Sequence, residues 1–487
     1  MKSRNFLLVL LLISLSSCQN FKPVDISAEI NTIENSLLPA IQVKGKEVEL
    51  MNIYDRMEFY KVPGVSIAVV KDGKLAWAKG YGKANTNTGQ EVDANTLFQA
   101  GSISKPLAAL ATLKLVEEEK LSLDEDVNLF LKEWKVTENR FTETERITLR
   151  RLLTHTAGMT VHGFPGYQQT DSFPSITQVL NGEGNTAAIF PDTVPGSIWR
   201  YSGGGYTVME KVVEDVSGMP LERYMDEFIL SPMGMQHSTY NQPLNKELHV
   251  NASAAYDSEG NIIEGLWHNY PEQAAAGLWT TPTDLATYCI EIQKIFNGKN
   301  KGILSQNMVK LMLTKHKNGW GLGPSLMWEN DSLIFGHGGK NAGFTNDMKA
   351  FAHKGDAIII MTNADNGGKL IAEIMRSVSK FYDWGIRKQK VVELKPLPSD
   401  ELSQFAGTYK LDFQVPDIGD YLIDLRIQGD KIFVNDPNNK NTNLLSSLGD
   451  FKFIDLEKGD QIQFKIAEED GTIELLWNDR YNFNKAN

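Results

Sequence analysis

The spacing of apolar residues changes once along the chain, near residues 391–400, and this change divides the chain into two folding units. Beyond it, segments such as YLIDLRI and QIQFKI alternate apolar and polar residues strictly, and no helical period appears up to Asn487. Strict alternation with Gly and Asp between the runs is typical of antiparallel strands. We therefore expect a linker at 391–400 and a small all-β domain, a barrel or a sandwich, at 401–487.

Before the change, residues 51–390 mix the two periods. An apolar strand is expected at Val65–Val70, and Asp72–Gly73 supplies a tight turn into a second strand at Leu75–Ala78. Further strands are expected in SLIFGHGG, DMKAFAHK and AIIIMTN. Antiparallel strands with helices around them predict an α+β domain. Apolar residues at helical spacing predict helices at 103–119, 204–217, 221–229, 283–296 and 367–384.

Length and charge limit the classes of protein to which the chain can belong. A chain of 487 residues exceeds one ordinary core, which favours two or more domains. The formal net charge is −12, and no basic stripe is visible, so nucleic acid is excluded as an expected partner. We expect a small-molecule or peptide partner instead.

The N-terminal residues, MKSRNFLLVLLLISLSSC, are typical of a secreted bacterial lipoprotein. The apolar stretch Phe6–Leu15 is too short to span a bilayer as a stable helix and fits a signal peptide at 1–18. The residues before Cys18 resemble a lipoprotein cleavage site, which makes Cys18 the expected site of lipidation. The alternative is an ordinary signal peptide with an incidental cysteine. The first interpretation predicts a tether at 19–50 and a periplasmic protein of the bacterial cell envelope, held on a membrane by its lipid anchor.

Neither a metal centre nor a disulfide is expected. The one other cysteine, Cys289, lies at helical spacing among apolar residues, which indicates core packing. No His-Glu-x-x-His run and no thiolate cluster occurs. We therefore expect no metal and no cofactor.

The sequence GSISKP, residues 101–106, places a serine three positions before a lysine. Pro106 is tolerated only in the first turn of a helix, so Ser102 is expected at a helix N-terminus, where the positive helix end favours a developing oxyanion. Lys105 then points back along the same face towards the hydroxyl. The alternative is a plain helix cap with a solvated lysine. A second match, Ser377-x-x-Lys380, lies inside an amphipathic helical pattern and carries no chemical expectation.

Three further stretches add polar or aromatic residues next to glycine turns. His155 lies in LLTHTAGM, Tyr201 in WRYSGGGY and His337 in FGHGGKNAGF. Each has an ordinary structural interpretation when it is taken alone, as a satisfied histidine, a rim aromatic or a turn.

Taken together and in this order, GSISK, LLTHTAGM, YSGGGY and HGGKNAGF resemble the serine β-lactamase and penicillin-binding protein superfamily. The pattern is closest to its class C β-lactamase-like branch of D,D-peptidases and esterases. The similarity covers most of residues 50–390. It implies an antiparallel sheet flanked by helices, together with an all-helical subdomain.

The resemblance also implies roles for individual residues. Ser102 is the expected nucleophile, Lys105 the proton acceptor beside it, and Tyr201 a general acid and base whose pKa is lowered by nearby positive charge. The backbone N–H groups of Ser102 and Lys340 form the expected oxyanion hole. His155 matches a structural position and stays outside the catalytic set.

The expected substrate-binding residues depart from the family pattern at two places. His337, Gly338 and Gly339 match the strand segment that binds the carboxylate end of the substrate, but a histidine stands where the family has a lysine-type residue. Gly203 stands where the family usually has an asparagine that binds the acyl side chain. Both differences weaken an expectation of β-lactam turnover and leave acyl-enzyme chemistry intact.

Two functions therefore remain open. The first is a serine hydrolase that cleaves an ester or amide, of the peptide, D-amino-acid or β-lactam type, through a Ser102 acyl-enzyme. The second is a penicillin-binding or sensing protein that binds a ligand, or is acylated slowly, without turnover. A further possibility is that the C-terminal domain caps the active-site cleft and restricts substrate length.

Overall fold

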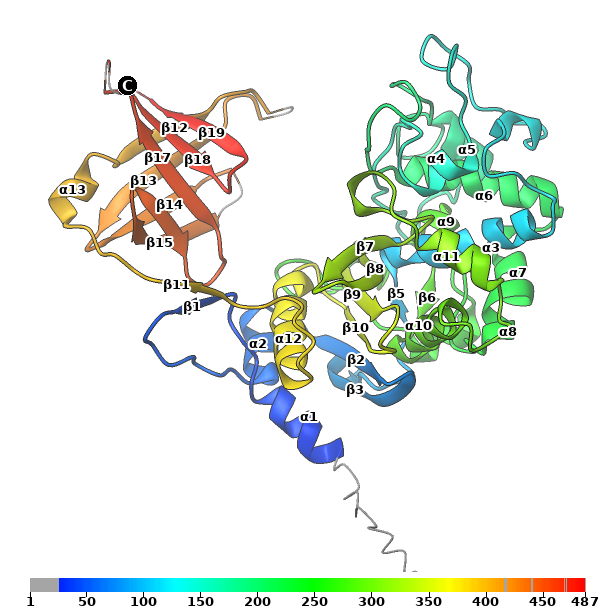
Figure 1. Cartoon of the computed structure of the whole chain (residues 1–487), viewed down its shortest axis with the longest axis horizontal. Coiled ribbons are helices and arrows are strands. Elements are labelled where there is room, and N and C mark those ends of the chain that lie inside the picture. Colours follow the sequence, from blue (N-terminus) through cyan, green and yellow to red (C-terminus); the bar gives the residue numbers. More distant parts are fainter. Residues whose placement is uncertain (1–25, 416–417, 439–440, 468, 470, 487) are drawn as a thin grey trace, which may run out of the picture.

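The computed structural model describes residues 26–487 except 416–417, 439–440, 468, 470 and 487 (Figure 1). The expected signal peptide and Cys18 lie outside the described residues. In the part of the chain that is described, no helix combines the length and the apolar character that a membrane span requires.

A seven-stranded antiparallel sheet lies at the centre of the first folding unit. Side chains of its middle strand alternate between two cores: Ile359 and Met361 pack on one face, and Ile358 and Ile360 on the other. Both faces are thus buried, which explains the continuous apolar run AIIIM. The predicted hairpin at Asp72–Gly73 is present, and its second strand extends to Asn85. The sheet order is β4 (Gln90–Glu91), β3 (Lys74–Asn85), β2 (Gly64–Lys71), β10 (Ala357–Thr362), β9 (Phe344–Phe351), β8 (Ser332–Asn341) and β7 (Ser325–Glu329).

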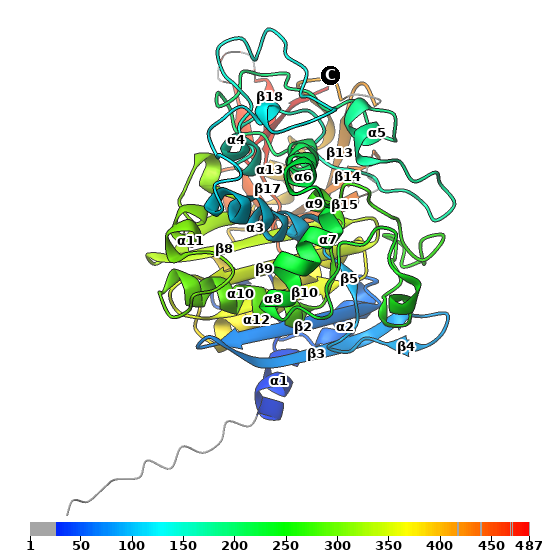
Figure 2. The same ribbon diagram turned by 90° about the vertical axis from the view of Figure 1, so that its right-hand side faces the viewer.

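Helices cover both faces of this sheet (Figures 1 and 2). One face packs against α12 (Gly367–Phe381) and α2 (Ile53–Phe59), and the other against α10 (Pro282–Phe296). The α+β architecture expected from the sequence is confirmed, but the helix expected at 221–229 divides into α7 and a π-helical turn, Asp226–Leu230. The helical region beside the sheet consists of α3 (Ser104–Glu117), α4 (Leu149–Leu153), α5 (Ile176–Asn181), α6 (Gly203–Ser217), α7 (Leu221–Met225), α8 (Ser231–Met233), α9 (Gln273–Ala276) and α11 (Gln306–Met312).

The expectation of a tether at 19–50 is wrong for the residues that are described. Helix α1 (Ile26–Glu34) buries Ile33 in the core beneath α12. Strand β1 (Ile41–Val43) pairs in parallel with β11 (Lys390–Val392), which overlaps the start of the expected linker. Ile33 and Leu37 of this segment are buried with side chains of α12, so the segment is part of the first folding unit.

The C-terminal unit is a closed eight-stranded antiparallel barrel, which decides between the two predicted β architectures. Its interior is filled by apolar side chains, and Leu402 of α13 (Ser399–Ser403) and Phe405 close it. Phe405 stacks on Phe464 with ring centroids 4.1 Å apart. The strands are β12 (Gly407–Leu411), β13 (Leu422–Gln428), β14 (Lys431–Asp436), β15 (Asn441–Gly449), β16 (Lys452–Asp455), β17 (Gln461–Ile466), β18 (Ile473–Trp477) and β19 (Tyr481–Lys485), and β19 pairs with β12.

Candidate active site

Ser102 lies in a tight turn that packs directly against strand β8. The turn is a 3₁₀ segment, Gly101–Ile103, that leads into α3, so Ser102 precedes the helix as expected. Gly101 has a φ of +54°, and a Cβ there would lie 2.5 Å from the backbone nitrogen of Lys340. A Cβ at Gly339 would likewise lie 1.9 Å from the carbonyl oxygen of Ala100. The two glycines therefore let the backbone of Gly101, the residue before Ser102, lie directly against that of Lys340. This is the arrangement that the expected oxyanion hole requires.

Strand β8 presents a free edge to this turn. Strand β7 pairs with β8 only as far as Gly336, whereas β9 follows it to Asn341. Over His337–Asn341, no strand pairs with the second edge in the part of the chain that is described. An extended substrate can therefore add its backbone to this edge beside Ser102.

Lys105 lies under the serine and is almost completely buried. Its Nζ atom is 3.0 Å from Ser102 Oγ and donates to the carbonyl oxygen of Ala275 at 2.7 Å. Burial lowers the pKa of Lys105 to about 7, because the charged ammonium loses its hydration. A lysine with this pKa is largely neutral just above pH 7, and it then has a lone pair for the serine proton. This geometry contradicts the alternative of a helix cap with a solvated lysine.

The second Ser-x-x-Lys sequence has a structural role. Ser377 is buried in α12, where its hydroxyl donates to the carbonyl of Ile33 at 3.1 Å and lies 3.0 Å from the hydroxyl of Ser36. It thus fastens the segment that follows α1 to α12. The contrast with Ser102 supports the distinction drawn from the sequence.

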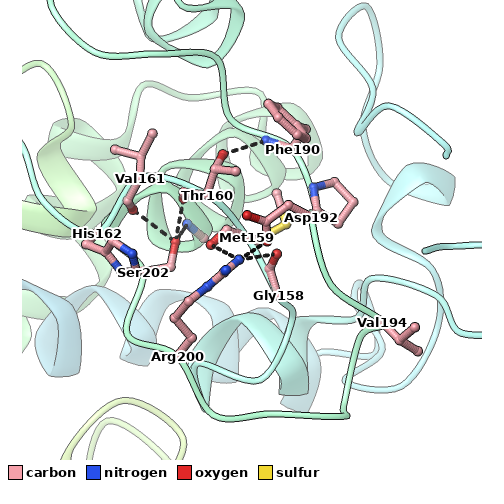
Figure 3. A network of polar contacts seen from close by, with 12 residues as sticks. Gly158, Met159, Thr160, Val161, His162, Phe190, Asp192, Val194, Arg200 and Ser202 are labelled. Carbon is pink, nitrogen blue, oxygen red and sulfur yellow. Dashed lines mark hydrogen bonds and ion pairs between the residues drawn. The ribbon is translucent and has the colours of Figure 1, made fainter. Parts of the chain in front are cut away.

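Tyr201 completes the cluster, and its two neighbours hold its backbone in place. Figure 3 shows the polar contacts of these neighbours, Arg200 and Ser202. The Arg200 guanidinium donates to the carbonyls of Gly158 and Met159 and pairs with Asp192. On the other side, the Ser202 hydroxyl donates to the carbonyl of Thr160 at 2.9 Å and caps α6 by accepting from Gly205 N. The Tyr201 ring centre lies 5.0 Å from Lys105 Nζ. The structure therefore brings Ser102, Lys105 and Tyr201 into one cluster.

The expectation that nearby positive charge lowers the pKa of Tyr201 is wrong. Burial raises the pKa of Tyr201 above its ordinary value of about 10, and the nearby Ser102 hydroxyl opposes this by a smaller amount. Positive charge does not lower the pKa, because the adjacent amine of Lys105 loses its own charge near neutral pH. The phenol is therefore neutral, and its hydroxyl has no well-formed hydrogen bond to any described residue. Such a group can donate a proton but does not supply a phenolate.

His337 faces the same cluster from strand β8 and is neutral. Its Nδ1 lies 2.5 Å from the carbonyl oxygen of Gly338, so Nδ1 carries the hydrogen and Nε2 presents a lone pair. Burial and the nearby Lys105 amine lower the pKa of His337 to about 3. His337 therefore offers a hydrogen-bond acceptor, not the positive charge that would bind a substrate carboxylate. Gly338 beside it is exposed, while Gly339 is pressed against the Ser102 turn.

The space beside Gly203, where the family usually has an asparagine side chain, is not empty. A Cβ at Gly203 would lie 2.8 Å from Cε2 of Phe164 and 3.2 Å from the carbonyl oxygen of His162. The loop that carries these residues is bonded to the start of α6, since Gly203 N donates to His162 O at 3.0 Å. The ring of Phe164 therefore occupies the space into which a side chain at position 203 would extend.

Three residues near the cluster were not identified as functional from the sequence. His155 was placed outside the catalytic set, yet its ring centre lies 4.3 Å from that of Tyr201, and its Nδ1 accepts from Ser202 N. The ring of Trp320 lies 5.5 Å from His337 and 5.9 Å from Tyr201. The sequence could not single out the carbonyl of Ala275, because every residue has a backbone carbonyl. The position of His155 within a family motif was the only available signal.

The described residues contain no group of three or more His, Cys, Asp or Glu side chains that could hold a metal ion. Cys289 is completely buried, and burial raises the pKa of its thiol. The thiol is therefore part of the core, as the sequence predicted.

Comparisons with known proteins agree with this geometry. The family model Beta-lactamase matches residues 52–376. Protein flp of Staphylococcus aureus (strain MRSA252) is 26% identical over 317 residues, which cover 63% of this chain and 60% of flp. The putative penicillin-binding protein PbpX of Bacillus subtilis (strain 168) is 27% identical over 321 residues, covering 62% of this chain and 71% of PbpX. The chain thus spans about three fifths of the length of flp.

A solved structure shows the same fold over a larger part of the chain. The octameric penicillin-binding protein homologue from Pyrococcus abyssi superimposes with a TM-score of 0.61 at 24% identity, covering 89% of this chain and 98% of that one. At this identity the likeness concerns the fold. Because the family model covers well over half of the chain, the protein belongs to the Beta-lactamase family.

Proposed function

We propose that this protein is a serine hydrolase that cleaves an ester or amide through an acyl-enzyme at Ser102. The observation that carries the proposal is the 3.0 Å contact between Ser102 Oγ and the buried Lys105 amine, whose pKa is lowered to about 7. Two features support it: the backbone of Lys340 beside the nucleophile and the free edge of β8, along which a substrate can bind.

The proposed reaction has two steps. In acylation, Ser102 Oγ attacks the substrate carbonyl carbon while its proton passes to Lys105 Nζ, and the bond to the leaving group breaks. The leaving group takes the hydroxyl proton of Tyr201. The protonated Lys105 amine then passes its extra proton to the Tyr201 oxygen. In deacylation, water attacks the ester carbonyl and gives a proton to Lys105 Nζ. The bond between the acyl carbon and Ser102 Oγ then breaks, and Nζ returns this proton to Oγ, so that Ser102 is released as the alcohol. The neutral phenol of Tyr201 fits this sequence because it begins as a proton donor.

The apolar contact at Gly203 bears on the substrate class. With Phe164 in place of an amide, the acyl side of the site favours an apolar or aromatic group over one that needs a hydrogen bond. Esters and peptides with apolar acyl groups are therefore the first substrates to test, ahead of β-lactams.

The experiment compares wild type with Ser102→Ala and Ser377→Ala. Each is treated with a fluorophosphonate and with fluorescent penicillin, and then assayed with p-nitrophenyl esters, D-alanyl peptides and nitrocefin. The proposal predicts labelling and turnover in wild type and Ser377→Ala, and neither in Ser102→Ala. Equal labelling of all three proteins would refute it. Stoichiometric labelling without turnover of any substrate would favour the penicillin-binding or sensing function instead.

We also propose that the protein is a membrane-anchored lipoprotein of the bacterial cell envelope. The support is the signal-like sequence that ends at Cys18. Metabolic labelling with a palmitate analogue should mark the full chain and not Cys18→Ala, and an unlabelled wild-type protein would contradict the proposal.

A further inference from the structure

The orientation of the Lys105 amine depends on a short segment that contributes no side chain to the site. Nζ donates to the carbonyl of Ala275 in α9, a helix of only four residues. In the neutral amine, an N–H fixed on this carbonyl leaves the lone pair free to face Ser102 Oγ. A displacement of the Ala275 carbonyl would turn the lone pair away. The position of α9 therefore decides whether Lys105 can act as a base.

Two buried side chains from other elements hold this helix, one on each side of Ala275. Glu210 Oε2 accepts the backbone N–H of Ala274 at 2.8 Å, one residue before the carbonyl that binds Lys105. Asn341 of β8 donates to the carbonyl of Ala276 at 3.0 Å, one residue after it. The backbone bonds from Ala275 N and Ala276 N to the carbonyl of Glu272 shape the turn itself. Glu210 is therefore the contact that fixes α9 against α6.

Glu210 also connects α9 to Tyr201. It lies in α6, which begins two residues after Tyr201, and its side chain is 2% exposed. Helices α6 and α9 pack against each other, and both contact α3, which carries Lys105. The carboxyl group thus joins the helix behind the phenol to the helix that orients the amine.

We propose that Glu210 is a positioning residue for acylation: by holding Ala274, it fixes the Ala275 carbonyl that directs the Lys105 amine at Ser102. This inference rests on the proposed function. Glu210 itself does not contact the substrate. It predicts that the chemical step, and not substrate binding, depends on an acceptor oxygen at the end of this side chain.

The test uses three substitutions that differ in this acceptor. Glu210→Gln keeps an oxygen at the same reach, Glu210→Asp withdraws it by one methylene group, and Glu210→Leu removes it. A displacement of about 1 Å at a reacting group can lower a rate about 100-fold. We expect Glu210→Leu and Glu210→Asp to lower kcat for ester hydrolysis at least about 30-fold with little change in KM, and Glu210→Gln to stay within about threefold of wild type.

The matched control is Asp215, which lies in the same helix. It too is a buried acidic residue that accepts a backbone N–H, from Lys132 at 2.9 Å, and it also pairs with Lys211. Neither of these contacts involves α9. Asp215→Leu should lose thermal stability and keep kcat per folded protein. If Glu210→Leu does not fold, Glu210→Asp and Glu210→Gln still separate the outcomes.

The two proposals can fail separately. If wild type shows no Ser102-dependent acylation, the proposed function is wrong. If wild type is acylated, and Glu210→Asp or Glu210→Leu reacts at the wild-type rate per folded protein, Glu210 does not position the base. A parallel loss of kcat in Asp215→Leu would also overturn the inference, because any buried carboxylate of α6 would then have the same effect.

Discussion

The barrel and the first folding unit differ in whether their buried polar side chains have hydrogen-bond partners. In the barrel, buried Asn443 donates to Asp455 and Asp460, both at 3.0 Å. Among the described residues, every buried side-chain polar atom without a partner lies before residue 385, and Tyr201, His337 and His155 are among them. Unpaired buried polar groups cost stability, so a protein keeps them where a ligand or reaction needs them. The comparison supports the proposal that the chemistry lies in the first unit.

Removing the buried amine should have the largest effect. Lys105→Met keeps the volume of the side chain but has no lone pair for the serine proton, so acylation should fall about 1000-fold, within the usual range for a general base. Stopped-flow acylation by a p-nitrophenyl ester measures this rate. The control is Lys114→Met, a half-buried lysine later in the same helix, which should react at the wild-type rate. Similar rates for the two variants would show that Lys105 is not the base.

Filling the space at Gly203 should have a smaller effect. Gly203→Ala pushes against Phe164, whereas Gly205→Ala, two residues later in the same helix, meets its nearest atom, in the side chain of Leu152, at an ordinary 3.5 Å. Off-rotamer adjustments of this kind cost about 1–3 kcal/mol, so we expect kcat/KM to fall about tenfold in Gly203→Ala and little in Gly205→Ala. Phe164→Ala should restore activity to the Gly203→Ala protein. A gain of β-lactam turnover in Gly203→Asn, without a change at Phe164, would contradict the interpretation that Phe164 fills the space beside residue 203.

Disrupting the barrel should have the smallest effect on activity. Phe405→Ala removes a completely buried ring, and such a change costs about 3–5 kcal/mol of the stability of that unit. We expect thermal unfolding of the barrel at a lower temperature and an acylation rate within about twofold of wild type. A large change in substrate selectivity below the unfolding temperature would instead support a barrel that caps the cleft.

The comparison of sequence and structure shows which parts of the site can be predicted. Ser102 and Lys105 could be paired because residues three apart in a helix share a face, and strict alternation revealed the barrel strands. The pKa of Tyr201 was predicted in the wrong direction because burial, which dominates it, depends on packing between distant segments. The Ala275 carbonyl and its support from Glu210 could not be found, since neither a backbone acceptor nor a long-range contact has a sequence signature.

The pH dependence of acylation shows whether Lys105 reacts as a neutral amine. Lys105 must lose a proton before it can accept one, so the rate should rise with pH and level off above its pKa of about 7. His337, with its pKa lowered to about 3, and Tyr201, with its raised pKa, should not titrate between pH 5 and 9. We expect a single ionisation near pH 7 in the rate of Ser102 acylation, measured by stopped flow and absent in Lys105→Met. A rate that is independent of pH over this range, or one that reaches half its maximum only near the ordinary lysine pKa of about 10.4, would contradict it.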